Sequence, residues 1–165
     1  DAAGTTSMPL DGALAGRPDY PRNVVITVTH DTSVVAMSGV ITGTDIHDKP
    51  ITEAWSVAAT GTSKTFTGKK GFKTVTSITE VVAADASANS IIAGSGKVFG
   101  LSGRCSVASA VKEVADGSVA TNGTVAAASS AATDDARGTY APNAAPDGSK
   151  DFTIWYISDD PELSD

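Results

Sequence analysis

The sequence predicts an all-β fold, either an antiparallel β-sandwich or a β-barrel-like domain, with an extended N-terminal arm. Two observations lead to it. Val, Ile and Thr alternate with a period of two, and Pro, Gly and Asp interrupt these runs at short intervals. Both features are typical of antiparallel strands joined by tight turns. The Ala-rich stretch 125–136 carries no apolar stripe that a helix would need to dock, so we expect eight to ten short strands and no convincing helix.

The clearest signal is the segment from Val40 to Val82, which reads as strand, turn, strand, loop and strand. HDKP at 47–50 supplies the first turn. In the strand after it, the side chains of every second residue share a face. One face is therefore expected to carry Ile51, Glu53, Trp55 and Val57, and the other Thr52, Ala54, Ser56 and Ala58.

Further strands follow from the same pattern. We expect them at 23–30, 72–82, 90–94, 97–101, 118–121 and 151–158, the last being the most apolar and therefore central. Residues 104–115 are ambiguous, because Val107, Val111 and Val114 have helical spacing, but a strand is favoured by the β-rich surroundings. Asp116-Gly117 and Asn122-Gly123 are predicted hairpin turns. The Ala- and Ser-rich stretch 125–136 is predicted to be a surface loop.

Length and charge limit the domain organisation and the partners. The 165 residues predict an arm at 1–22, a single β domain at 23–158 and an acidic tail at 159–165. The net charge of −7 argues against nucleic acid as a partner, since phosphate binding needs a basic surface. No apolar run is long enough for a membrane helix, so no membrane partner is expected.

Few residues suggest chemistry. His30-Asp31 and Asp45-His47-Asp48 lie beside turns, and we interpret them as turn residues, because zinc needs three or four converging ligands. GSGKVFG at 94–100 lacks the phosphate-loop pattern. The acidic pairs Asp134-Asp135 and Asp159-Asp160 lack an EF-hand spacing, and Cys105 is expected to be a buried apolar group. We therefore predict a protein that is not an enzyme, with no catalytic residues, no metal site and no cofactor.

The aromatic residues leave one alternative open. Trp55 and Trp155 are more typical of a core than of a sugar platform. If Trp55, Trp155 or Tyr140 were exposed beside Asp or Asn, the domain could instead be a carbohydrate-binding β-sandwich. Buried tryptophans would argue against that reading.

Several segments together resemble a group of small structural proteins of tailed bacteriophages. They are RNVVITVTH, VITGTDIHDKPITEAWSV, KTFTGKKGFKTVTSITEV, GSGKVFGL and RGTYAPNAAPDGSKDFTIWYI. The resemblance covers about Pro21 to Ile157, and the Ala- and Ser-rich region 117–136 departs from it.

This resemblance implies a virion structural protein, in particular a capsid decoration or cement protein on the exterior of the capsid. Its partners would be the major capsid protein and further copies of itself, as a dimer or trimer. It would act by adding contacts across capsomer junctions, and the arm 1–22 could lie along a neighbour. A neck or tail component of the same class is the alternative within the virion.

Overall fold

The computed structural model describes residues 4–8, 20–82, 89–108 and 111–159. Within these residues there is no helix, and all strand pairs are antiparallel. The all-β prediction is therefore confirmed. The described part of the chain also contains no helix with the length and hydropathy needed to cross a bilayer.

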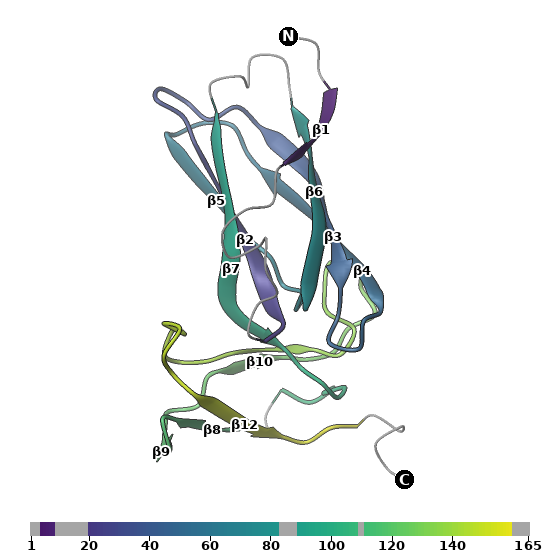
Figure 1. Ribbon diagram of the computed structural model, residues 1–165, viewed down its shortest axis with the longest axis vertical. Coiled ribbons are helices and arrows are strands. Elements are labelled where there is room, and N and C mark those ends of the chain that lie inside the picture. The colour runs from purple at the N-terminus through teal and green to yellow at the C-terminus, as the bar shows by residue number, and fades with distance from the viewer. Residues whose placement is uncertain (1–3, 9–19, 83–88, 109–110, 160–165) are drawn as a thin grey trace.

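Three sheets make up the molecule (Figure 1). Sheet A has the order β1 (Gly4–Met8), β6 (Thr74–Val82), β3 (Met37–Thr44), β4 (Pro50–Val57). Sheet B has the order β10 (Thr124–Ala126), β11 (Thr139–Ala141), β7 (Ser90–Gly100), β2 (Arg22–Thr29), β5 (Ser63–Thr67). Sheet C has the order β12 (Phe152–Tyr156), β8 (Val111–Ala115), β9 (Ser118–Val119).

Sheets A and B face each other across the first core. Val24, Ile26 and Val28 of β2 are buried, while Val25, Thr27 and Thr29 between and after them are only partly buried. On β4, Glu53, Trp55 and Val57 are buried and the intervening residues are exposed, as the alternation predicts. The first core also contains Val34, Met37, Ile41, Phe72, Val75 and Ile78.

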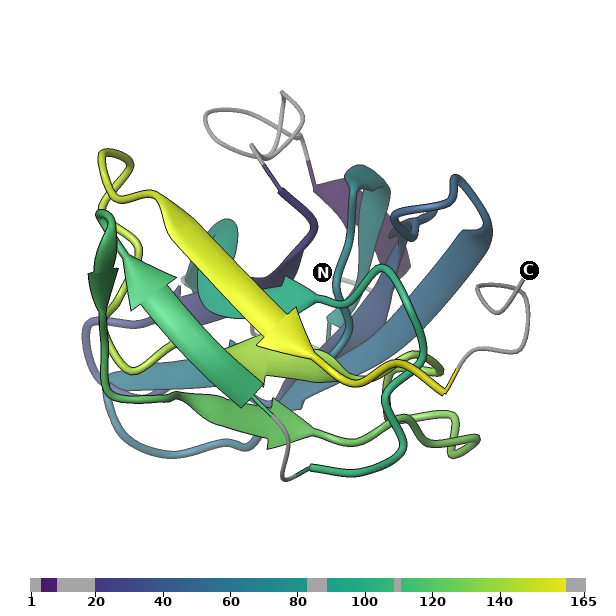
Figure 2. The same cartoon turned by 90° about the horizontal axis from the view of Figure 1, so that it is seen from below.

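Sheet C packs across one end of this sandwich and encloses a second core. It lies at the lower end in Figure 1 and faces the viewer in Figure 2. Phe99, Leu101, Cys105, Val125 and Tyr140 are buried there against the inner side of sheet C. Cys105 is 1% exposed, so its predicted role as a buried apolar group is confirmed.

Two strand predictions need correction. Residues 90–100 form one continuous strand, β7, because Gly94 and Gly96 lie within the sheet and do not interrupt it. The segment 151–158 is not central: β12 lies at the edge of the small sheet C. Its two apolar faces have different surroundings, since one covers the second core and the other is exposed.

Other segments agree in part with what the sequence predicts. Of the ambiguous stretch 104–115, only 111–115 forms a strand. Asp116-Gly117 is a hairpin turn with positive φ at both residues, as predicted. Asn122-Gly123 is not a hairpin turn, because the strands on either side of it belong to different sheets. Within the expected arm, 4–8 form β1 on sheet A, while 1–3 and 9–19 lie outside the described residues.

Candidate functional site

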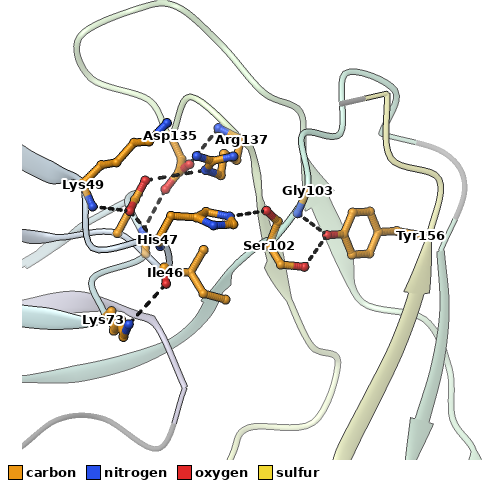
Figure 3. A network of polar contacts seen from close by, with 11 residues as sticks. Ile46, His47, Lys49, Lys73, Ser102, Gly103, Asp135, Arg137 and Tyr156 are labelled. Carbon is orange, nitrogen blue, oxygen red and sulfur yellow. Dashed lines mark hydrogen bonds and ion pairs between the residues drawn. The ribbon is translucent and has the colours of Figure 1, made fainter. Parts of the chain in front are cut away.

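A network of polar contacts joins the β3–β4 turn to sheet C (Figure 3). Asp45 accepts hydrogen bonds from the backbone N–H groups of His47 and Lys49, each at 2.9 Å. The side chain of His47 reaches across to the carbonyl oxygen of Ser102, 2.8 Å from Nε2. These contacts fix the turn and use His47 to tie it to the end of β7, so its predicted role as a turn residue is confirmed.

The same network continues into β12 and into the loop before β11. The Tyr156 hydroxyl accepts from the Gly103 N–H at 2.7 Å and lies 3.0 Å from the Ser102 hydroxyl. On the other side, Arg137 Nε lies 3.6 Å from Asp45 Oδ2, and both side chains are largely buried. The network therefore connects four chain segments and holds the second core against the first.

Asp135 also binds backbone groups next to this network. One carboxylate oxygen accepts from the Gly71 N–H and the other from the Arg137 N–H, both at 2.9 Å. Asp134, its neighbour, forms an exposed ion pair with Lys69 at 3.0 Å. This acidic pair thus positions loops, which is the commonest task of Asp in such places.

The remaining histidine has a local role. His30 Nδ1 accepts hydrogen bonds from the backbone N–H groups of Thr32 and Ser33, at 2.9 and 3.1 Å. It therefore closes the turn after β2, as the sequence predicts. The described residues contain no group of three or more His, Cys, Asp or Glu side chains that could hold a metal ion.

A buried glutamate that the sequence analysis did not single out lies in the second core. Glu113 is 0% exposed, and Oε2 accepts from the Tyr140 hydroxyl and from the N–H groups of Gly123 and Asn143. Burial and this contact together raise the pKa of Tyr140 to about 12. The available signal was the period-two pattern of 111–115, which places Glu113 on the same face as Val111.

The three aromatic side chains considered for sugar binding differ in their exposure to solvent. Trp55 is 2% exposed and Tyr140 is 0% exposed, so neither can act as a sugar platform. Trp155 is 53% exposed on the outer face of sheet C, where the Lys112 ammonium lies 5.7 Å from its ring centroid. The expectation that both tryptophans belong to the core is wrong for Trp155.

Several exposed apolar side chains belong to sheet C or to the segments beside it. Seven large apolar side chains are exposed in the described residues, and four belong to sheet C or to the segments beside it. These four form what we call the sheet C patch: Val107, Val119, Trp155 and Ile157. Trp155 and Ile157 share a face by alternation, while Val119 pairs with Val114 in the neighbouring strands.

Comparisons with known proteins do not assign the chain to a family. No protein-family model matches the chain, and no curated protein or solved structure matches it. The candidate site therefore consists of two features of the molecule itself. They are the network of polar contacts and the exposed sheet C patch.

Proposed function

We propose that this chain is a non-enzymatic structural protein of a phage virion, namely a capsid decoration protein that binds the outer shell across capsomer junctions and stabilises it. The observation that carries the proposal is the sheet C patch. Trp155 and Val119 are exposed on β12 and β9 of sheet C, which lies at the lower end of the molecule in Figure 1. Clustered apolar side chains of this kind commonly mark a surface that binds another protein.

The sheet C patch is small. It has four side chains, whereas each partner of a stable complex contributes roughly 20–30 residues. A single contact of this size is weak. Many copies on one shell, or a dimer or trimer bridging two capsomers, would bind far more tightly through avidity.

The polar groups support a structural role as well. Asp45, His47 and Asp135 bind backbone groups in turns and loops. Each of them is used to hold the fold. The resemblance of the strand-and-turn segments to phage structural proteins supports the same class, and the major capsid protein is the partner we propose.

The test is co-sedimentation with purified tailless capsids of the phage that encodes the chain, with the copy number measured by quantitative mass spectrometry. We expect hundreds of copies per shell for the native chain. Trp155→Ser should lower occupancy about tenfold, because a central exposed tryptophan carries much of the energy of such a contact. Ile92→Ser is the matched control, because Ile92 is 69% exposed on β7 of sheet B, outside sheet C.

Other outcomes would redirect the assignment. A handful of copies per virion would place the protein in the neck or tail. No association with any part of the virion would contradict a structural role. Full binding by Trp155→Ser would contradict the sheet C patch as the contact surface.

A carbohydrate-binding module is the second candidate, and the exposure of Trp155 is the observation that favours it. An exposed indole ring can stack on a sugar, and Lys112 and Thr153 supply polar groups on the same face. Binding of a glycan panel would then change the fluorescence of the native chain but not that of Trp155→Phe. An unchanged spectrum of the native chain would remove this candidate.

A further inference from the structure

β12 has an open edge. It pairs with β8 from Phe152↔Ala115 to Tyr156↔Val111, and no described strand pairs with its other side. An open edge exposes backbone N–H and C=O groups that can pair with another extended chain. At the end of the strand, Asp159 donates its N–H to the carbonyl of Arg104 at 2.9 Å, so only the part before it is open.

A cavity of about 320 Å³ lies beneath this edge. Phe152, Ile154 and Tyr156 line it, which are the three inward side chains of β12. The inward side chains of β8, among them Glu113, do not line it. The cavity therefore lies on the open side of β12. A strand added there, about 4.8 Å from β12, would point its inward side chains into the cavity.

The cavity wall opposite β12 is aromatic and carries a cation. The ring of Phe99 contacts Tyr20 edge to face at 5.8 Å and Phe152 at 5.6 Å. The Arg22 guanidinium lies 5.3 Å from the centroid of the same ring. Lys150 and Asp151 also line the cavity, and Lys150 Nζ lies 2.8 Å from Asp147 Oδ2. An aromatic side chain fits such walls.

The open edge of sheet A is built differently. β4 turns the charged Glu53 inward, and Lys70 donates from Nζ to the carbonyl of Thr52 at 2.8 Å. Inward charges and capped carbonyls are devices that discourage strand pairing. β12 carries neither, because its inward residues Phe152, Ile154 and Tyr156 are uncharged.

We propose that β12 and this cavity bind an extended segment of another polypeptide, which continues sheet C and inserts an aromatic side chain into the cavity. Backbone pairing supplies the affinity of such a complex, and the side-chain cavity supplies its selectivity. The inference rests on the proposed function for the origin of the segment, which is then a loop or arm of the shell protein.

The experiment selects a random library of short linear peptides on the full chain and measures the affinity of the enriched peptides. We expect an aromatic residue in the enriched sequences. Tyr20→Ala, which removes part of the wall, and Lys150→Glu, which reverses a charge, should each weaken binding about tenfold. Ile92→Ala should bind as the native chain does. Amide hydrogen exchange should show that Thr153 or Ile154 becomes protected when peptide binds.

Three outcomes overturn the inference. They are no enriched peptide, equal binding by Tyr20→Ala and Lys150→Glu, and full protection of the β12 amides without peptide, which would mean that the chain itself covers the edge. The two proposals fail separately: peptide binding without capsid binding contradicts only the decoration role. Capsid binding unaffected by Tyr20→Ala and Lys150→Glu contradicts only this inference.

Discussion

Two glutamates occupy inward strand positions that usually hold apolar side chains. Glu53 lies between Ile51 and Trp55 on the core face of β4, and its carboxylate accepts from the N–H groups of Lys69 and Lys70 at 2.6 and 3.5 Å. Burial nevertheless raises its pKa above the ordinary value of 4.5, and the two N–H groups offset this only in part. A buried carboxylate of this kind lowers stability when it is charged.

The free energy of unfolding should depend on pH because of Glu53. Because the folded pKa of Glu53 is raised, the folded chain holds a proton that the unfolded chain has already released. The contribution of Glu53 is therefore fully present below pH of about 4.5 and is lost as the pH rises through the folded pKa. The free energy of unfolding of the native chain minus that of Glu53→Gln should fall as the pH rises from 4 to about 7. Urea titrations of both proteins measure this difference. A difference that rises with pH would contradict a raised pKa of Glu53.

At the scale of the elements, the close approach of β3 to β6 depends on a glycine. A Cβ atom added at Gly39 would lie 1.8 Å from the carbonyl oxygen of Thr79 and 2.6 Å from Trp55 Nε1. Trp55 Nε1 also donates to that carbonyl at 3.0 Å. Glycine at this position leaves room for the indole N–H to reach the carbonyl oxygen of Thr79.

A pair of glycine substitutions tests this explanation. Gly39→Ala should lower the free energy of unfolding by about 1–3 kcal/mol or more, because backbone atoms would have to move. Gly94→Ala is the control, since Gly94 lies in β7 and a Cβ there meets nothing within 4 Å. It should be neutral or stabilising by about 0.5–1 kcal/mol. Urea unfolding followed by Trp fluorescence measures both, and equal losses would contradict a specific role for Gly39.

At the scale of the whole molecule, two cores of unequal size are joined by the polar network. The first core contains eleven buried apolar residues between two sheets of four and five strands. The second contains five, beneath three short strands. Since stability grows with the apolar area buried, the second core should open more easily than the first.

The single cysteine reports this opening. Cys105 is buried in the second core, so a thiol reagent can modify it only when that core opens. As urea increases, we expect Cys105 modification to begin before the fluorescence of Trp55 changes, measured in a Trp155→Phe background. His47→Ala, which removes the contact to Ser102, should advance the modification further. Coincident transitions would show that the two cores unfold as one unit.

Much of the first core could be predicted from the sequence. The alternation at 51–58 grouped Glu53, Trp55 and Val57 on one face, which is the buried one, because period two is a local property of an extended chain. The same rule was insufficient for β12, where both faces are apolar and the pattern cannot tell a central strand from an edge strand. The exposure of Trp155 and the burial of Glu113 depended on which segments lie opposite them.

The sequence by itself determined the all-β class, most strand positions, the turn roles of His30 and His47 and the burial of Cys105. These follow from backbone preference and side-chain chemistry within a few residues. Only the tertiary structure decided that sheet C closes one end, that β12 has an open edge above a cavity, and that Trp155 is exposed on the same strand. Such features arise where segments distant in sequence meet, and a local pattern does not record which segments those will be.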